Sequence, residues 1–254
     1  MQIKPLVQAK IRVPLSIVFF FGSSEYIASG PVYIWLIDAG EKIVVDAGVA
    51  ENAMYPVEGG GEKGVINALE QEKLSPEDVE TLVITHLHFD HCANAHLFHN
   101  ARVYVQKREW EFAMNPLPVL RDLYVEKYLE TLESMDLCLV KGDLEIADGV
   151  KLVALPGHTP GLQGILVKTK SGKYLMASDH FYSYMNIFPP KQNIEIQNEY
   201  GKAVIPAQKS PFFPIGLYVS LQDWFESCYK AASIVKKSRI IPGHDPSLEG
   251  RSFE

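Results

Sequence analysis

The sequence predicts an α/β fold in which two β-sheets carry helices on their outer faces. Short strand signals alternate with helical ones along the chain, and such alternation is typical of sheets covered by helices. The pattern also occurs twice. Residues 32–46 and 164–179 each comprise a strand, a charged turn containing Gly, and a second strand that ends in Asp. We therefore expect two similar halves with one sheet each.

In the first half, β-branched and aromatic runs bounded by turn residues indicate strands at 32–37 and 42–45. Apolar residues at helical spacing predict a helix over 62–73. The Ser75-Pro76 pair predicts the start of a further helix, with Ser75 as its N-cap. The other elements expected here are strands at 81–85 and 102–105 and helices at 109–114 and 120–135.

In the second half, a Lys-Ser-Gly-Lys turn predicts a hairpin between strands at 164–169 and 174–177. The other elements expected here are strands at 144–146, 150–155 and 239–241 and a helix at 224–235.

Charge, hydropathy and cysteine content exclude several classes of protein. The 24 Lys+Arg and 31 Asp+Glu give a net charge of −7, which disfavours binding to nucleic acid. No apolar run approaches the roughly 20 residues of a membrane span, and no secretory signal pattern begins the chain. Three irregularly spaced cysteines without a Cys-x-x-Cys pair predict no disulfide framework and a cytoplasmic location.

Four residues that can bind metal follow the strand expected at 81–85: His86, His88, Asp90 and His91. Alternate residues of an extended chain point the same way, so His86 and His88 can address one ion. Asp90 and His91 follow the turn and can address another. Imidazole nitrogens and carboxylate oxygens suit Zn²⁺ and related ions without any thiolate. The segment therefore predicts a metal centre at the end of a strand.

The segment His-Leu-His-Phe-Asp-His at 86–91 matches the pattern His-x-His-x-Asp-His, and the chain thereby resembles the metallo-β-lactamase superfamily. The remaining family ligands match His158, Asp179 and His244 in order and context. The resemblance covers nearly the whole chain. It implies an αβ/βα four-layer sandwich with two mixed β-sheets. It also implies a single hydrolase domain over 1–254, because ligands from both halves meet at one site.

The resemblance further implies how these residues share two divalent ions, with Zn²⁺ favoured over Fe, Mn or Co. One ion would be held by His86, His88 and His158, the other by Asp90, His91 and His244, and Asp179 would bridge both. The nucleophile of such a centre is a hydroxide shared between the ions, so no Ser or Cys nucleophile is needed.

Within the superfamily, the chain looks like the N-acyl-homoserine lactone lactonases, which act in quorum quenching. Those enzymes carry a Phe inside the motif, as Phe89 here, and a Tyr three residues after the bridging Asp, as Tyr182 here. The segment 142–161 is also similar to theirs. The resemblance implies opening of a small-molecule lactone, with Tyr182 stabilising the oxyanion and Asp90 passing a proton to the leaving alkoxide.

Other functions within the same fold stay open on the sequence. A thioesterase resembling glyoxalase II, or a lactonase for another small ring, would use the same ligands. Nucleases of this fold need a basic surface, which a net charge of −7 does not offer. Di-iron redox proteins of this fold resemble His-x-Glu-x-Asp at the motif, whereas His88 stands here. The chain is expected to be a monomer or a homodimer.

Several residues near the motifs have two interpretations. Cys92 fits a small buried side chain better than a thiolate ligand, and Asp46 either supports the site or ends a strand. Tyr182 itself can be a packed aromatic residue. His180 stays open because it follows Asp179, whereas the two other spare histidines, His96 and His99, match no ligand position. Residues that can either line a substrate pocket or belong to the core are Phe181, Phe188, Phe212, Phe213 and residues 15–21.

Overall fold

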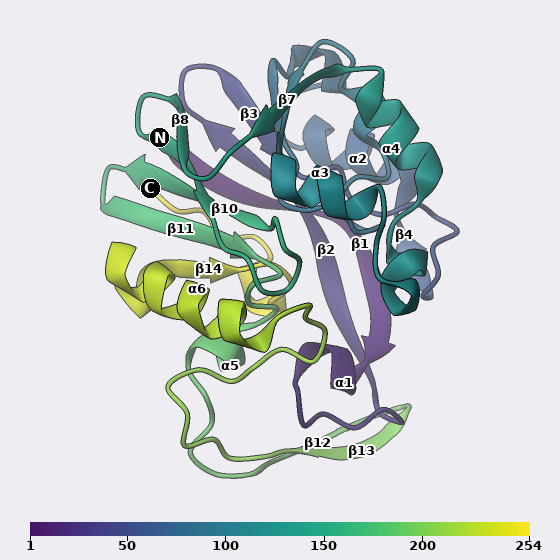
Figure 1. The fold of residues 1–254 in the computed structure, drawn as a ribbon, viewed down its shortest axis with the longest axis vertical. Helices are drawn as coiled ribbons and strands as arrows, with labels where there is room; N and C mark the ends of the chain where they lie inside the picture. The colour runs from purple at the N-terminus through teal and green to yellow at the C-terminus, as the bar shows by residue number, and fades with distance from the viewer.

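The computed structural model describes residues 1–254 and contains two large β-sheets with helices on their outer faces (Figure 1). The first sheet has seven strands in the order β4-β1-β2-β3-β5-β6-β7. Its strands are β1 (Gln2–Pro14), β2 (Ile27–Asp38), β3 (Lys42–Val45), β4 (Val57–Gly59), β5 (Thr81–Val83), β6 (Arg102–Gln106) and β7 (Asp136–Val140).

The second sheet has five strands in the order β14-β11-β10-β9-β8. Its strands are β8 (Leu144–Ala147), β9 (Val150–Ala154), β10 (Gln163–Thr169), β11 (Gly172–Ser178) and β14 (Ile240–Pro242). A separate hairpin, β12 (Ile194–Asn198) and β13 (Gly201–Ile205), lies at the bottom of Figure 1. The helices are α1 (Leu15–Val18), α2 (Gly61–Glu70), α3 (Lys107–Ala113), α4 (Glu126–Glu133), α5 (Tyr184–Ile187) and α6 (Leu221–Ile234).

Strand β2 shows how the layers are held together. Its residues alternate between two buried clusters, because successive side chains of a strand point to opposite faces. Ile34 packs in the cluster that contains residues of α2 and α4, whereas Trp35 packs in the cluster between the two sheets. A third cluster joins α6, through Trp224, to Leu175 of the second sheet. The layers therefore run helix, sheet, sheet, helix, which confirms the predicted αβ/βα sandwich.

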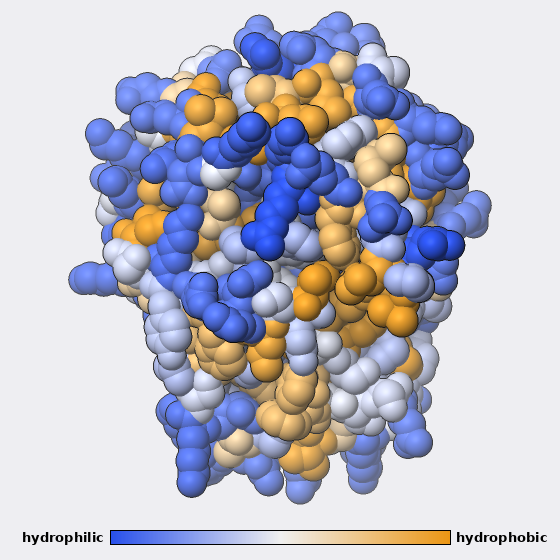
Figure 2. Space-filling model, viewed as in Figure 1, coloured by the Kyte–Doolittle hydropathy of each residue, from blue (hydrophilic) through white to orange (hydrophobic).

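Figure 2 shows hydrophilic side chains over much of one face, with apolar patches between them. The longest helix, α6, has 14 residues, and none of the helices combines the length and the apolar character that crossing a membrane requires.

Most predicted elements are present, but two predicted helices are wrong. Residues 120–135 form a 3₁₀ turn at Pro118–Leu123 and then α4, with an extended break at Tyr124. The break has a tertiary cause: the carbonyl of Leu123 accepts a hydrogen bond from Phe89 N at 2.9 Å, and Tyr124 is buried against the core. The helix predicted to start at Ser75 is only a 3₁₀ turn, Pro76–Asp78.

Five strands and two short helices that the sequence pattern did not predict complete the architecture: β1, β4, β7, β12, β13, α1 and α5. Strand β1 mixes Lys, Arg, Gln and Pro with its apolar residues, so its alternation is weak. It nevertheless pairs with β2 in antiparallel register along nearly its whole length, from Gln2 opposite Asp38 to Pro14 opposite Ile27. Pairing with β2 therefore fixes β1 despite its weak pattern.

Strand direction brings the motif loops to one edge of the sandwich. Strands β3 and β5 are parallel, as are β11 and β14, and β9 and β11 both run antiparallel to β10. The carboxyl ends of β3, β5, β9, β11 and β14 lead directly into the segments that carry the predicted ligands or Asp46. The loops after these strands converge at one site.

Candidate metal centre

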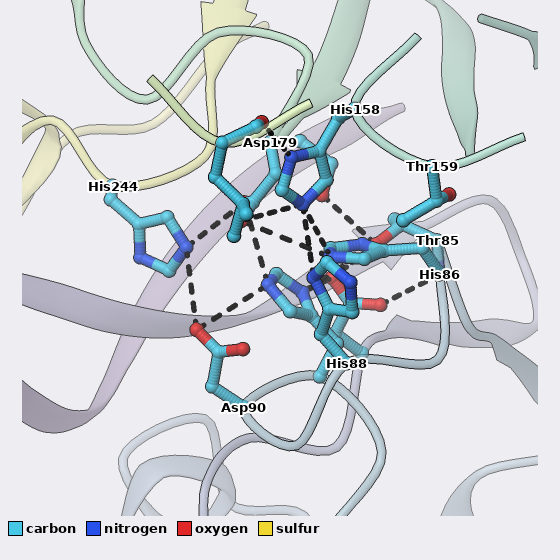
Figure 3. Close-up of polar contacts among 12 residues, drawn as sticks. Thr85, His86, His88, Asp90, His158, Thr159, Asp179 and His244 are labelled. Carbon is cyan, nitrogen blue, oxygen red and sulfur yellow. Dashed lines mark hydrogen bonds and ion pairs between the residues drawn. The ribbon is translucent and has the colours of Figure 1, made fainter. Parts of the chain in front are cut away.

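Seven side chains from both halves form two adjoining groups that can each hold a metal ion (Figure 3). Within each group, one potential ligand atom per residue lies within 4.8 Å of the others. The first group consists of His86, His88 and His158, and the second of Asp90, His91, Asp179 and His244. These are the seven residues that the sequence predicted as ligands, and the fold brings all of them together.

In the first group, three ring nitrogens converge on one point. His86 Nε2 lies 3.1 Å from His88 Nδ1, and His158 Nε2 lies 3.2 Å and 3.0 Å from these two atoms. His86 and His88 follow β5 of the first sheet, whereas His158 follows β9 of the second. All three side chains are at most 3% exposed. Protons cannot satisfy three nitrogens that face one another at once, whereas a single cation can.

In the second group, histidines and carboxylates alternate. Asp179 Oδ1 lies 2.9 Å from His244 Nε2 and 3.4 Å from His91 Nε2. Asp90 Oδ2 lies 3.7 Å from His91 Nε2 and 3.9 Å from His244 Nε2. The mixed nitrogen and oxygen donors are those that Zn²⁺ and related divalent ions accept.

Asp179 connects the two groups. Its Oδ1 faces His91 and His244, whereas its Oδ2 lies 3.8 Å from His86 Nε2 and 3.7 Å from His158 Nε2. Figure 3 shows its carboxylate between the two sets of rings. One carboxylate can therefore contact an ion on each side.

Hydrogen bonds on the far side of the rings fix their orientation. His158 Nδ1 donates to the carbonyl of Leu217 at 2.8 Å, and His244 Nδ1 donates to the carbonyl of Pro31 at 2.7 Å. His91 Nδ1 lies 2.8 Å from Asp46 Oδ2. Because a ring nitrogen that carries a proton toward a backbone or carboxylate oxygen leaves the other nitrogen free, these contacts present Nε2 of each ring to an ion. The proposed supporting position of Asp46 agrees with this contact.

The two groups differ in protonation. Burial, together with the neighbouring histidines, lowers the pKa of His86 and His88 well below the usual range. Burial by itself would lower the pKa of His91 and His244, but the neighbouring carboxylates, chiefly Asp179 and Asp90, together outweigh burial and raise both pKa values. The first group thus offers neutral nitrogen donors at pH 7, which is the form that metals bind.

Unpaired buried atoms are a second observation that favours a divalent ion at this site. His91 Nε2 and Asp179 Oδ1 are buried side-chain atoms without a hydrogen-bond partner. Buried polar atoms are nearly always paired, so unpaired ones need an explanation. Both atoms belong to the second group and face its centre, and a cation there would satisfy both.

An apolar cavity of about 350 Å³ adjoins the centre. Side chains of both ligand groups form one wall, together with Tyr182. The other walls are apolar and include Ile11, Val13, Leu15, Ile17, Phe19 and Ile205. Such a cavity, with few polar groups on one side, is typical of a small-molecule site.

The cavity shows which of the residues with two interpretations line a pocket and which belong to the core. Of residues 15–21, Leu15, Ile17, Val18 and Phe19 line it, as one of the two interpretations of this segment expected, whereas Phe20 and Phe21 do not. Phe181, Phe212 and Phe213 are fully buried core residues, and Phe188 is half exposed; none of these four lines the cavity.

Tyr182 is 7% exposed and lies in the wall between the two groups. Its ring centroid is 5.7 Å from that of His158 and 5.8 Å from that of His244. Burial raises the pKa of its hydroxyl well above the usual range, so the group stays protonated and can donate a hydrogen bond into the cavity.

The spare cysteine and histidines lie outside both groups. Cys92 is buried, and its thiol donates toward the carbonyl of His88 at 3.4 Å, so it is the small buried side chain that the sequence favoured. His180 is fully buried, stacks on Trp224 and lies 3.3 Å from Cys228 Sγ. His96 pairs with Glu62 at the surface.

Sequence reasoning missed two parts of the site. The carbonyls of Pro31 and Leu217 carry no side-chain signal, so no motif could reveal them. Glu109, which the sequence placed on a helix without a role, is fully buried beside the ligand loops. A charged residue in the first turn of a short helix ordinarily faces solvent, and only the fold shows that this one does not.

Comparisons with known proteins agree with this geometry. Residues 28–244 match the metallo-beta-lactamase superfamily. An N-acyl homoserine lactonase of Bacillus sp is 33% identical over 174 residues, which cover 61% of this chain and 66% of that protein. The N-acyl homoserine lactonase AiiB of Rhizobium rhizogenes is 28% identical over 155 residues, covering 57% and 55%. The matched segment thus spans less than two thirds of these relatives.

Solved structures show the same fold. A quorum-quenching N-acyl homoserine lactone hydrolase superposes with a TM-score of 0.78 at 24% identity and covers 98% of this chain and 94% of its own. A dizinc quorum-quenching lactonase, AidC, has a TM-score of 0.69 at 15% identity, over 96% and 87% of the two chains. Because the family match covers most of the chain and includes all seven ligand positions, the chain belongs to the metallo-β-lactamase superfamily.

Proposed function

We propose that this chain is a dinuclear-metal hydrolase that opens the ring of N-acyl-homoserine lactones. The observation that carries the proposal is the pair of ligand groups joined by Asp179 beside an apolar cavity. The similarity to N-acyl homoserine lactonases supports the substrate class. The proposal also takes residues 1–254 as one hydrolase domain, since both sheets supply ligands.

The proposed ligand sets follow the two groups. His86, His88 and His158 would hold one ion, Asp90, His91 and His244 would hold the other, and Asp179 would contact both. Zn²⁺ is the ion we favour for these nitrogen and oxygen donors, with Fe, Mn or Co as alternatives. When bound, two such ions activate water for attack at neutral pH and neutralise negative charge that develops on the substrate.

Two side chains would act on the substrate directly. The Tyr182 hydroxyl, which remains protonated, would donate a hydrogen bond to the carbonyl oxygen as negative charge builds up on it. Asp90, whose side chain is the most exposed of the four in the second group, would pass the proton released by the attacking water to the ring oxygen as it leaves. Both residues line the cavity, so both are within reach of one bound lactone.

The cavity would take the acyl chain. Its walls beyond the ligands are formed by the end of β1, by α1 and by Ile205 of β13, and these side chains are aliphatic or aromatic. An alkyl chain gains roughly 25 cal/mol for each Å² of apolar surface that leaves water. The cavity therefore favours a lactone with an alkyl substituent over a bare ring or a highly charged substrate.

The chain's partners, location and oligomeric state are also matters of proposal. We propose no nucleic-acid partner, on the net charge of −7, and a cytoplasmic location, on the cysteine pattern. A monomer or a homodimer is compatible with a site whose seven ligands all come from one chain.

The test combines metal analysis with hydrolysis measured by pH-stat. We expect two divalent ions per chain and turnover of N-acyl-homoserine lactones that exceeds that of thioesters and of unsubstituted lactones. The His158→Ala variant should lose most of the activity together with one ion. Two bound ions with no turnover of any lactone would refute the substrate class, and turnover of thioesters alone would favour a glyoxalase II-like enzyme.

A further inference from the structure

Glu109 is a buried carboxylate whose partners are all neighbours of metal ligands in the chain. It stands in the first turn of α3 and is fully buried. Its Oε1 accepts a hydrogen bond from Leu87 N at 3.0 Å. Its Oε2 accepts from Thr159 Oγ1 at 2.5 Å and from Gly161 N at 3.1 Å. No atom of a ligand itself is among these partners.

The partners belong to the two loops that supply the three-histidine group. Leu87 lies between His86 and His88, in the loop after β5 of the first sheet. Thr159 directly follows His158, in the loop after β9 of the second sheet. Figure 3 shows Thr159 at the edge of the cluster, with its hydroxyl pointing away from the histidine rings. One carboxylate thus joins loops from opposite sheets.

The fit between α3 and the second loop is close. A Cβ added at Gly161 would lie 2.1 Å from Glu109 N and 2.5 Å from its Cα. No side chain fits there, so the helix backbone lies against the loop and the Glu109 side chain has little freedom. The contact holds the start of α3, and with it Glu109, against the loop that carries His158.

Burying the Glu109 carboxylate costs free energy, and packing alone gives no reason for a carboxylate at this position. A buried carboxylate is costly unless it is hydrogen-bonded, and burial raises the pKa of Glu109 against the effect of its three donors. An apolar side chain would satisfy packing, but it would leave Leu87 N and Gly161 N without a partner. These two N–H groups lie one to three residues from a predicted ligand. Loss of their hydrogen bonds to Glu109 would therefore release the loops that carry the ligands.

We propose that Glu109 is a positioning residue that preassembles the three-histidine group by tying the loop of His86 and His88 to the loop of His158. The inference rests on the proposed metal centre. In the second group, contacts with Asp46 and with the Pro31 carbonyl orient His91 and His244 instead. Loss of Glu109 would therefore weaken the binding of one of the two ions selectively.

The test is a stepwise titration of metal-free protein with Co²⁺ in competition with a chelator. The absorption of bound Co²⁺ measures the affinity of each equivalent. In Glu109→Gln, one amide oxygen replaces two acceptors, and we expect one of the two equivalents to bind about tenfold more weakly or worse. The other equivalent should stay within twofold. Thr159→Val should weaken the same equivalent by a smaller factor, and Thr159→Ser, which keeps the hydroxyl, should restore it.

The control is Glu111→Gln, two residues along the same helix, where the side chain is exposed and pairs only with Lys107. It should leave both equivalents unchanged. Equal weakening of both equivalents, or no change in either, in a folded Glu109→Gln protein would overturn the inference. If Glu109→Gln does not fold, the Thr159 pair decides in the same way. If the unmodified chain binds no metal, the proposed function fails first; if it binds two and Glu109→Gln binds both normally, only this inference fails.

Discussion

At the scale of single residues, two strained strand ends hold the site. Asp46 after β3 and Ser178 at the end of β11 have positive φ values of 63° and 48°, which are unusual for residues with a side chain. Thr85 Oγ1 lies 2.9 Å from Asp46 Oδ2 and 2.9 Å from Ser178 Oγ. These hydrogen bonds link the first sheet to the second and aim Asp46 at His91. The strain therefore lies where residues are oriented for function.

Replacing Tyr182 by Phe tests its proposed role as a hydrogen-bond donor. The ring would still pack between His158 and His244, while the donor to the oxyanion would be lost. We expect kcat to fall on the order of a hundredfold, with metal content unchanged, as measured by lactone hydrolysis and metal analysis. Tyr184→Phe, two residues along and outside the cavity, is the control. A decrease of tenfold or less would show that Tyr182 is a packed aromatic residue.

At the scale of elements, the β12–β13 hairpin closes the far side of the cavity. Ile205 of β13 packs with Leu15 and Phe19 in one buried cluster. The hairpin tip is attached to the first sheet, because Tyr200 Oη accepts from Arg12 Nη1 at 2.5 Å and Asn198 Nδ2 donates to the carbonyl of Ile27 at 2.8 Å. If the proposed function holds, this hairpin limits the length of the acyl chain that the cavity can accept.

Filling the cavity at Ile205 should alter chain-length preference. In Ile205→Trp, the larger ring would occupy space that a long acyl chain needs, so KM for long-chain lactones should rise about tenfold, as one or two lost apolar contacts imply. Short-chain lactones should be hydrolysed as before. The neighbouring Val204 points outward and is 46% exposed, so Val204→Trp is a matched control. Equal effects on both chain lengths would place the acyl chain elsewhere.

A second element-scale prediction concerns Asp143, which joins the second sheet to α6. Its carboxylate lies 2.8 Å from Lys230 Nζ of α6 and 3.8 Å from Lys151 Nζ of β9, and it accepts from Ala154 N at 3.0 Å. Partial burial raises its pKa, but the hydrogen bond from Lys230 and the other contacts outweigh burial and lower it. A carboxylate with a lowered pKa stabilises the fold above its unfolded pKa of about 4 and loses that contribution as pH falls.

We therefore expect Asp143→Asn to lower the free energy of unfolding at pH 7 by up to about 1 kcal/mol, because solvent screens this partly exposed cluster. The difference from the unmodified protein should shrink below pH 4 and vanish near pH 2. Urea unfolding at several pH values measures it. Asp148→Asn, an exposed residue in the next turn, should show no such dependence. A difference that is constant with pH would mean that charge is not its cause.

At the scale of the whole molecule, the site joins the two halves. His86, His88, Asp90 and His91 follow the first sheet, whereas His158, Asp179 and His244 follow the second. An ion held between them stabilises the folded chain relative to the unfolded one, since the unfolded chain has no assembled site. Binding and the packing of the two sheets are therefore coupled.

Metal removal should lower thermal stability as a result. An ion present at about a thousand times its Kd contributes about 4 kcal/mol, which corresponds to roughly 10 °C in Tm for a chain of this size. We expect a chelator to lower Tm by about that amount in a single transition, and Zn²⁺ to restore it, as followed by circular dichroism. An unchanged Tm would mean that no ion joins the halves, and two separate transitions would contradict the proposed single domain.

The sequence by itself determined the layers, the family and the seven residues that the structure gathers into the two groups. Strand patterns and the run of His and Asp at 86–91 are local signals, because they stand in consecutive residues, whereas His158, Asp179 and His244 were predicted from the resemblance to the superfamily. The Asp that ends each repeated strand-turn-strand unit, Asp46 and Asp179, was also visible. What was missed depends on contacts between distant segments. Strand β1 is defined by pairing with β2, and the predicted helix at 120–135 is broken because Leu123 bonds to Phe89.

Only the tertiary structure decided how the ligands are supported and what lies beside them. The carbonyls of Pro31 and Leu217 orient two histidines, and no sequence pattern marks a backbone oxygen. The cavity is built from β1 and α1, which are consecutive, and from β13, which is far from them in the chain, so its walls appear only when the chain has folded. The same holds for Glu109, whose three donors come from two loops of opposite sheets. Ligand chemistry is a property of residue types and their order, whereas preorganisation is a property of long-range packing.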